Sequence, residues 1–274
     1  MKVHNEDKSL KAIVIGASSD IGNALCEDWI LKGWEVAGTY RTNSPIIDNL
    51  RKKNIALIEC DLENTISIDK SCTYLNEKIT SWDVLVLSPG LLEPVDFFCK
   101  SNFEEWENSV KINFTSQLRF VHRLLPNRSP AGFLGPNVLF FAGGGTNSAP
   151  VNYSAYTVSK IALIKMVELL ASELPDVKFL IVGPGWVKTK IHHSILNTCD
   201  LNSESYKRTA LMFENGEFTP MDKVVKCCNT LISGSREILT GRNYSVVHDK
   251  WDDPRLIEQL EKNPDAYKLR RYGN

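Results

Sequence analysis

Residues 11–22 read KAIVIGASSDIG, and this stretch decides the fold. The apolar run Lys11–Ile15 has the length of a buried strand, and the glycine- and serine-rich residues 16–22 form a turn that leads into the helical periodicity of Ile21–Leu31. The first N–H groups of a helix are free and carry the positive end of its dipole. The turn therefore predicts a site for an anion such as the pyrophosphate of a dinucleotide. A plain strand-to-helix turn is the alternative interpretation.

Asp20 occupies the position where the full G-x-G-x-x-G dinucleotide fingerprint has its middle glycine. A carboxylate that faced a phosphate would repel it. We therefore expect the Asp20 side chain to turn away from the anion and to cap the N-terminus of the helix.

Short apolar runs and helical stretches continue to alternate along the chain. Strands are predicted at Lys11–Ile15, Glu35–Thr39, Ile55–Glu59, Val84–Leu87, Val138–Phe141, Val177–Val182 and Tyr244–Val247. Helices are predicted at Ile21–Leu31 and around residues 46–53, 66–79, 103–125, 154–174 and 221–232, the last with Thr219 as N-cap and Pro220 at its first position. This alternation predicts a single α/β domain, with a doubly wound parallel sheet of about seven strands and helices on both faces.

The composition is that of an ordinary globular protein and excludes several function classes. The chain of 274 residues carries 32 basic and 33 acidic side chains, so its net charge of −1 predicts neither nucleic acid nor an anionic membrane as a partner. The first residues are too polar for a signal peptide, and no apolar stretch approaches the ~18 residues of a membrane span. The seven scattered cysteines show no C-x-x-C or Cys/His metal spacing, which predicts reduced thiols, no metal and a cytoplasmic location.

A candidate catalytic pair lies in residues 152–160, NYSAYTVSK. Tyr156 and Lys160 are four residues apart, which on a helix places both side chains on one face, about 5–6 Å apart at Cβ. A phenol has a pKa of ~10, and a neighbouring ammonium lowers that pKa because it stabilises the phenolate. Such a pair could protonate a carbonyl oxygen while hydride reaches the carbonyl carbon. Tyr74 and Lys78 have the same spacing, so the spacing alone does not identify a site.

Five features of the sequence resemble the short-chain dehydrogenase/reductase family in their order and spacing. They are Gly16–Gly22, Asp61, Asn113, the Tyr156/Lys160 pair and residues 184–189 (PGWVKT). The resemblance extends from about residue 10 to residue 248. It implies a Rossmann-like sheet with strand order 3-2-1-4-5-6-7 and an NAD(P)-dependent oxidoreductase that interconverts a carbonyl and a secondary alcohol. It also separates the two pairs, because Tyr156 lies on the helix after the fifth strand, where the family has its catalytic tyrosine.

The resemblance implies a role for each matching residue. Tyr156 would be the acid/base group, Lys160 would lower its pKa and hold the nicotinamide ribose, and Asn113 would keep a kink in its helix and hold a water that passes protons to Lys160. Asp61 would accept a hydrogen bond from the adenine amino group. The residues expected to bind the cofactor are Gly16, Ser18, Ser19, Ile21, Gly22, Arg41, Asp61, Leu62, Gly90, Tyr156, Lys160, Pro184, Gly185, Val187 and Thr189. Each of these roles has a structural alternative. Asp61 could cap the end of a strand, Asn113 could be an ordinary helix residue, and residues 184–185 could form a plain turn.

Two stretches depart from the family pattern. The family's catalytic serine stands 13 residues before the tyrosine, and here that position is Gly143, within AGGGTNS at 142–148. The missing hydrogen bond to substrate could come from backbone N–H groups of the triple glycine, from Thr146 or from Ser148. Otherwise catalysis is lost, and the protein is a nucleotide-binding sensor or scaffold of the same fold. Residues 87–90 (LSPG) replace Asn-Asn-Ala-Gly, which keeps Gly90 but removes a side-chain amide.

Residues 38–41 (GTYR), at the end of the second predicted strand, bear on the choice of cofactor. An acidic residue here binds the ribose 2′-hydroxyl of NAD, whereas an arginine accommodates the 2′-phosphate of NADP. Tyr40 replaces the acid and Arg41 follows it, which favours NADP(H) over NAD(H). A solvated loop charge is the alternative for Arg41.

Two segments interrupt the rhythm of strands and helices. Residues 188–218 are polar, irregular and long enough for an active-site lid, in which His192 and its basic neighbours could meet an anionic group of the substrate. Residues 1–248, this lid included, would form the NAD(P)-binding catalytic domain. The tail 249–274, with a helix at Pro254–Glu261, would belong to the same domain, contact a partner subunit or be mobile. The expected partners are a small carbonyl or alcohol substrate, related to sugars by resemblance, and further copies of the chain in a homodimer or homotetramer.

Overall fold

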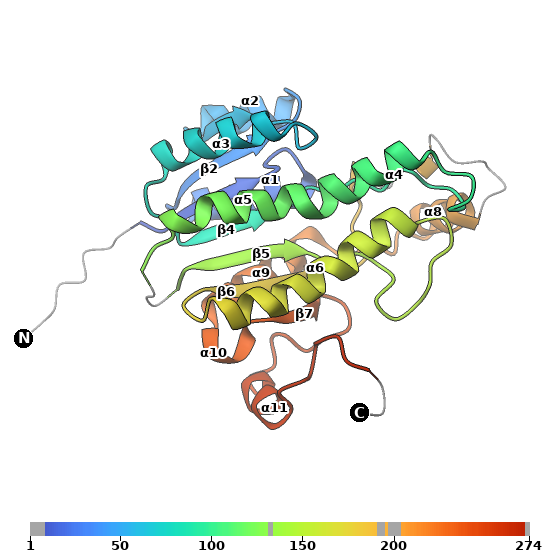
Figure 1. The fold of residues 1–274 in the computed structure, drawn as a ribbon. Helices are drawn as coiled ribbons and strands as arrows, with labels where there is room; N and C mark the ends of the chain where they lie inside the picture. Colours follow the sequence, from blue (N-terminus) through green and yellow to red (C-terminus); the bar gives the residue numbers. More distant parts are fainter. Residues whose placement is uncertain (1–8, 131–133, 191–194, 197–203, 272–274) are drawn as a thin grey trace, which may run out of the picture.

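The computed structural model describes residues 9–130, 134–190, 195–196 and 204–271. Its seven strands form one sheet in the order β3-β2-β1-β4-β5-β6-β7, and every neighbouring pair is parallel. The strands are β1 (Lys11–Ile15), β2 (Glu35–Tyr40), β3 (Ala56–Glu59), β4 (Val84–Leu87), β5 (Asn137–Phe141), β6 (Lys178–Gly183) and β7 (Arg242–Ser245). The predicted single α/β domain with a doubly wound, Rossmann-like sheet is confirmed (Figure 1).

Helices cover both faces of the sheet. They are α1 (Asp20–Leu31), α2 (Pro45–Lys52), α3 (Thr65–Lys78), α4 (Phe103–Val110), α5 (Ser116–Leu124), α6 (Ser154–Glu173), α8 (Glu204–Asn215), α9 (Met221–Ser233), α10 (Arg236–Leu239) and α11 (Leu256–Lys262). Figure 1 looks onto the face that α3, α5 and α6 cover, and α1 and α9 pack on the opposite face.

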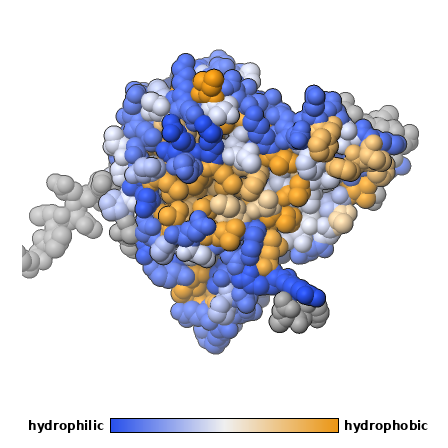
Figure 2. Space-filling view, in the orientation of Figure 1, coloured by the Kyte–Doolittle hydropathy of each residue, from blue (hydrophilic) through white to orange (hydrophobic). Residues whose placement is uncertain are grey.

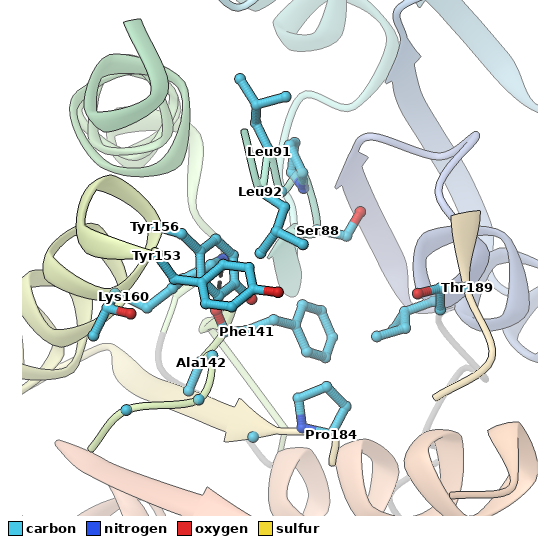
Figure 3. Close-up of a pocket in the computed structure, with 18 of the residues that line it drawn as sticks. Ser88, Leu91, Leu92, Phe141, Ala142, Tyr153, Tyr156, Lys160, Pro184 and Thr189 are labelled. Atoms are coloured by element: carbon cyan, nitrogen blue, oxygen red, sulfur yellow. Dashed lines mark hydrogen bonds between the residues drawn. The ribbon is translucent and has the colours of Figure 1, made fainter. Parts of the chain in front are cut away.

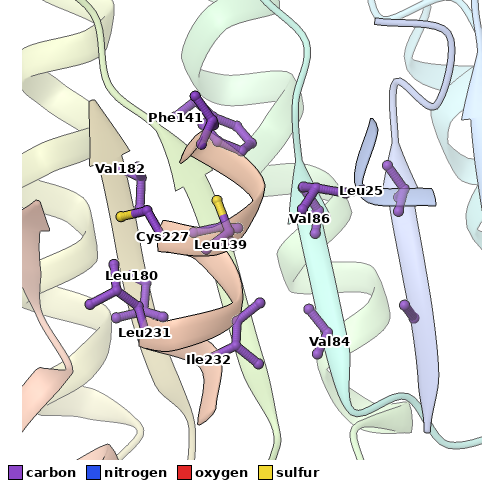
Figure 4. Packing of buried hydrophobic residues seen from close by; sticks show 14 of the residues in the cluster. Leu25, Val84, Val86, Leu139, Phe141, Leu180, Val182, Cys227, Leu231 and Ile232 are labelled. Carbon is purple, nitrogen blue, oxygen red and sulfur yellow. The ribbon is translucent and has the colours of Figure 1, made fainter. Parts of the chain in front are cut away.

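Alternate residues of each strand serve the two faces. In β1, Ala12 and Val14 pack into the cluster beneath α1 and α9, whereas Ile13 and Ile15 pack into the cluster beneath α3, α5 and α6. Because both faces are buried, the strand is apolar throughout rather than alternately polar. Figure 4 shows the same packing at α9, where Leu231 rests on the side chains of β5 and β6.

The predicted helix 103–125 is three segments. A π-helical turn, η1 (Lys111–Thr115), separates α4 from α5, and a short 3₁₀ turn, η2 (Leu125–Asn127), follows. Asn113 lies within the π-helical turn, a feature that often marks functional sites.

Two other predictions of local structure were wrong. The proposed lid at 188–218 is not irregular throughout, because its described residues include α8. The N-cap of α9 is Pro220 rather than Thr219, although the helix begins at Met221, as the predicted range 221–232 has it. Boundaries of this kind depend on how the preceding loop packs, and the backbone N–H of Thr219 donates to the carbonyl of Trp186.

The described part of the tail, 249–271, folds back onto the domain. The Trp251 side chain donates to the carbonyl of Val246 at 3.1 Å, and the backbone N–H of Asn243 in β7 donates to Tyr267 at 2.8 Å. Arg270 pairs with Glu168 of α6 at 2.6 Å. The tail therefore covers the free edge of β7, with α11 at its centre.

Within the described residues, no helix is long and apolar enough to cross a membrane. The same residues contain no group of three or more His, Cys, Asp or Glu side chains placed to hold a metal ion. The cysteines described are free thiols: Cys26, Cys60, Cys72, Cys227 and Cys228 are buried and Cys99 is exposed.

Candidate active site

A cleft of about 2010 Å³ opens at the carboxyl ends of the strands (Figure 3). Its walls come from the turn after β1, the ends of β2, β3 and β4, the loop 141–153, the first turns of α6 and the segment 183–190 after β6. The strand order reverses between β1 and β4, and ligands of open α/β sheets bind at such a switch point. The fold therefore brings most of the predicted site residues, which are spread along the sequence, into one cleft.

The turn after β1 permits a close approach of backbone to a ligand. Gly16 has a φ of +82°, and a side chain on Gly22 would come within 2.5 Å of the Gly16 carbonyl oxygen, so α1 packs directly on the turn. Ser19 is the N-cap of α1, and its hydroxyl accepts a hydrogen bond from the Gly22 N–H at 3.0 Å. Gly22 packs against the turn but does not line the cleft, whereas Gly16, Ser18, Ser19 and Ile21 do.

Asp20 does not cap α1, contrary to the prediction, because Ser19 occupies that position. Asp20 Oδ2 instead accepts a hydrogen bond from the backbone N–H of Lys190 at 2.9 Å. Lys190 also donates through Nζ to the carbonyl of Ser18 at 3.4 Å. Two residues that are 170 positions apart thus fasten the segment after β6 across the glycine turn.

Ser88, which stands where the family has an asparagine, also supports the glycine turn. Its hydroxyl donates to the carbonyl of Ile15 at 2.7 Å and accepts from the Ser19 hydroxyl at 3.0 Å. The sequence marked this position only as a lost amide. Its contribution comes from the pairing of β1 with β4, which no local pattern predicts.

Three predicted cofactor residues line the cleft beyond β2 and β3: Arg41, Asp61 and Leu62. Asp61 Oδ1 accepts a hydrogen bond from the Glu63 N–H at 2.9 Å. Arg41 is exposed and makes no hydrogen bond or ion pair with the described residues. Nearby, the Ser44 hydroxyl is buried with no partner among those residues. This end of the cleft therefore offers a guanidinium and a hydroxyl to a ligand.

Tyr156 and Lys160 lie on the first two turns of α6 and line the cleft (Figure 3). Lys160 is only 3% exposed, and its Nζ donates to the Phe141 carbonyl at 2.9 Å. Nζ lies 5.7 Å from the centre of the Tyr156 ring. The sequence alone predicted the spacing of these groups but not the backbone carbonyl that holds the ammonium.

Burial dominates the titration of both groups. It raises the pKa of Tyr156 to about 12 and lowers the pKa of Lys160 to about 8. The predicted lowering of the tyrosine pKa is therefore wrong, because burial disfavours the charged phenolate. At neutral pH the pair is a protonated phenol beside an ammonium.

Asn113 is fully buried and does not line the cleft. Its Nδ2 donates to the Leu91 carbonyl at 2.7 Å, and its Oδ1 accepts from the Leu91 N–H at 2.8 Å. The side chain thus fastens the π-helical turn to the loop after β4. The predicted relay through this residue remains a prediction, and the described contacts give the side chain a positioning role.

The segment after β6 forms the floor of the cleft. Pro184, Gly185, Val187 and Thr189 line it, as does Gly90 from the loop after β4. Gly185 has a φ of +76°, and a side chain there would come within 2.5 Å of a Val247 methyl group. This position therefore requires glycine.

Among the predicted substrate residues, Gly143 lies beside Tyr156. A side chain on Gly143 would lie 2.5 Å from Cε1 and 2.7 Å from the hydroxyl of Tyr156, so the two residues are in close contact. Thr146 and Ser148 line the cleft farther along the same loop. His192 lies outside the described residues.

The sequence did not single out Tyr153, which also lines the cleft. Figure 3 shows its hydroxyl and that of Tyr156 both pointing into the cleft, near Leu92, Phe141 and Pro184. The available signal was its position three residues before Tyr156, which on a helix is the same face.

Known proteins resemble this chain over most of its length. A family profile described as "short chain dehydrogenase" matches residues 10–200. The 3-oxoacyl-[acyl-carrier-protein] reductase FabG of Buchnera aphidicola is 28% identical over 86% of this chain and 94% of its own. The benzil reductase ((S)-benzoin forming) IRC24 of Saccharomyces cerevisiae is 28% identical over 68% of this chain and 74% of its own.

A solved structure extends the likeness to the fold. The short-chain dehydrogenase/reductase YIR035C of Saccharomyces cerevisiae superposes with a TM-score of 0.77 over 92% of this chain and 99% of its own, at 23% identity. The profile covers more than half of the chain, and the observed strand order is the one that the family resemblance implies. The chain belongs to the short-chain dehydrogenase/reductase family of NAD(P)-dependent oxidoreductases.

Proposed function

We propose that this protein is an NADP-dependent oxidoreductase that interconverts a carbonyl and a secondary alcohol, with Tyr156 as the acid/base group. One observation carries the proposal: the phenol of Tyr156 lies in the cleft beside the buried ammonium of Lys160. Reduction of a carbonyl needs a proton donor beside the substrate, and a phenol that lines the cleft can supply that proton.

The cleft fits a dinucleotide. The turn at Gly16 and the N–H groups at the start of α1 suit a pyrophosphate. Asp61 suits an adenine amino group, and Lys160 suits the ribose hydroxyls. A bound nicotinamide supplies or removes a hydride. In this proposal Tyr156 holds the proton that reaches the carbonyl oxygen, and Asn113 positions the loop at Leu91 that forms the opposite wall.

The preference for NADP rests on Arg41. Its guanidinium has no partner among the described residues, and the orphan hydroxyl of Ser44 lies three positions farther along the same cleft wall. A 2′-phosphate would provide acceptors for both groups. A guanidinium forms strong charge-assisted hydrogen bonds with phosphate oxygens.

The substrate that this cleft fits best is an apolar carbonyl compound rather than a sugar. Leu92, Phe141 and Pro184 line the cleft and offer an apolar surface to a substrate (Figure 3). A relative that is named a benzil reductase supports an aromatic ketone as the first probe.

We further infer a cytoplasmic homodimer or homotetramer. Phe103 on α4 and Val158 and Leu169 on α6 are 53%, 48% and 45% exposed, and Figure 2 shows apolar side chains gathered over this face of the molecule. The family resemblance pairs these two helices between subunits. Light scattering would test this inference, since Val158→Lys with Leu169→Lys should yield a monomer, and a wild-type monomer would contradict it.

The proposed function is tested by reduction of benzil and by cofactor binding, measured through nucleotide fluorescence. We expect turnover with NADPH, and Arg41→Ala should weaken NADPH binding about 10- to 100-fold while NADH binding is unchanged, because a charge-assisted hydrogen bond contributes about 1.5–3 kcal/mol. Arg123→Ala, an exposed arginine on α5 outside the cleft, is the matched control. Equal effects on the two cofactors would overturn the NADP assignment. NADPH binding without turnover on a panel of carbonyl compounds would favour the non-catalytic sensor.

A further inference from the structure

The space that a side chain at position 143 would need is already filled by Tyr156. A Cβ there would lie 2.5 Å from Cε1, 2.8 Å from Cζ and 2.7 Å from the hydroxyl oxygen, distances that real Cβ atoms essentially never show. The tyrosine ring therefore rests directly on the backbone of Gly143. A side-chain hydrogen-bond donor to the substrate oxygen is therefore excluded at this position while Tyr156 keeps its place, whereas the backbone N–H of Gly143 is not.

The hydroxyls that follow on the same loop, those of Thr146 and Ser148, also line the cleft. After Gly143 the chain passes Gly145, where a Cβ would lie 2.5 Å from a Thr157 methyl group and 3.3 Å from Pro150. The loop is thus packed on the side of α6 next to Tyr156 by the time it reaches Thr146, and Ser148 beyond it is exposed.

Tyr153, in contrast, is held firmly at the start of α6. Its carbonyl accepts a hydrogen bond from the Thr157 N–H at 2.8 Å. On either side of it, the Asn152 carbonyl accepts from the Asp96 N–H at 3.1 Å, and the Ser154 hydroxyl accepts from the Trp106 side chain at 2.9 Å. These hydrogen bonds hold the backbone on both sides of Tyr153 in place at the start of α6.

We propose that the Tyr153 hydroxyl is the second hydrogen-bond donor to the substrate carbonyl oxygen, in place of the family's serine. Tyr153 precedes Tyr156 by three residues, and both hydroxyls point into the cleft (Figure 3). This inference rests on the proposed function. During reduction, hydride adds to the carbonyl carbon and the proton of Tyr156 passes to the oxygen. Tyr153 donates a hydrogen bond to that oxygen throughout and keeps its own proton.

The test is Tyr153→Phe, assayed with benzil and NADPH. Removal of one such donor costs about 10²–10³-fold in kcat, so we expect a loss of that size in kcat, a KM for benzil within a few-fold of the wild type and an unchanged NADPH dissociation constant. Tyr74→Phe removes the same hydroxyl from α3, outside the cleft, and should change none of these values. An intact kcat in Tyr153→Phe would overturn the inference.

Competing donors are tested in parallel. Thr146→Val and Ser148→Ala should retain kcat within a few-fold, and a loss of about 10²-fold in either would assign the role to that residue instead. Gly143→Ala and Gly143→Ser should lower kcat to a similar extent, because both press on Tyr156, and a fully active Gly143→Ser would contradict the filled-space argument.

The two proposals fail in different ways. A wild-type protein that binds NADPH but reduces no carbonyl compound overturns the proposed function and, with it, the role of Tyr153. A wild type that is active, with Tyr156→Phe inactive and Tyr153→Phe unimpaired, overturns only the role of Tyr153.

Discussion

Helices α3 and α6 each carry a tyrosine followed four residues later by a lysine, and the two pairs have nearly the same internal geometry. The ammonium of Lys78 lies 5.4 Å from the centre of the Tyr74 ring, and that of Lys160 lies 5.7 Å from the centre of the Tyr156 ring. Lys78 is exposed and its helix lies away from the cleft, whereas Lys160 is buried and bonded to the Phe141 carbonyl. Local spacing therefore provides the pair, and the position of its helix relative to the carboxyl ends of the strands decides whether it can meet a substrate.

The largest expected difference between the two pairs is in catalysis. Tyr156→Phe removes the proposed proton donor and should lower kcat for benzil reduction by at least about 10²–10⁴-fold, the usual contribution of a positioned acid. Tyr74→Phe should retain the wild-type kcat. Steady-state kinetics with NADPH measure both, and a comparable loss in the two variants would break the comparison.

The second largest expected difference is in the effect of replacing the two lysines. Lys160→Met removes the charge beside Tyr156 and should reduce kcat/KM for NADPH by about 10²-fold, because a lost interaction with a charged partner in a dry site costs about 1.5–3 kcal/mol. Lys78→Met keeps the same volume on the surface of α3 and serves as the control, with no expected change. Circular dichroism of both variants should match the wild type, so that a loss of activity is not a loss of fold.

The pH dependence of kcat/KM should show the titration of the buried Lys160. Burial lowers the pKa of Lys160 to about 8, so the ammonium is present below that pH and is lost above it, whereas the pKa of Tyr156, raised to about 12, keeps the phenol protonated throughout. We expect kcat/KM for NADPH to be constant from pH 6 to 7 and to fall up to about tenfold per unit above pH 8. Residual activity of Lys160→Met should lack this step, and a wild-type profile that is flat to pH 10 would contradict the assignment.

The smallest effect concerns stability at α3. A cation over an aromatic ring at an exposed site contributes about 0.5–1 kcal/mol, so Lys78→Met should change the free energy of unfolding by no more than about 1 kcal/mol. Urea denaturation measures this value. A much larger loss would show that the α3 pair has a structural role that its exposure does not reveal.

Most of the fold could be predicted from the sequence because strands and helices each have a characteristic spacing of apolar residues along the chain. The seven strands and the helices α1, α3, α6 and α9 lie close to their predicted positions, and the strand order is the one that the family resemblance implied. The exceptions depend on partners far away in the chain. Asp20 is engaged by Lys190 rather than by its own helix, and the π-helical turn at Asn113 is pinned to Leu91.

The candidate site divides in the same way. Residue types and their order were enough to select the glycine turn, Tyr156, Lys160 and the segment after β6, since each belongs to a local motif. Only the tertiary structure decided that the Tyr156 ring occupies the space beside Gly143, that desolvation raises its pKa, and that Tyr153 points into the same cleft. The physical reason is range: a sequence pattern reports neighbours within about one helical turn, whereas burial and close contact are set by segments that packing alone brings together.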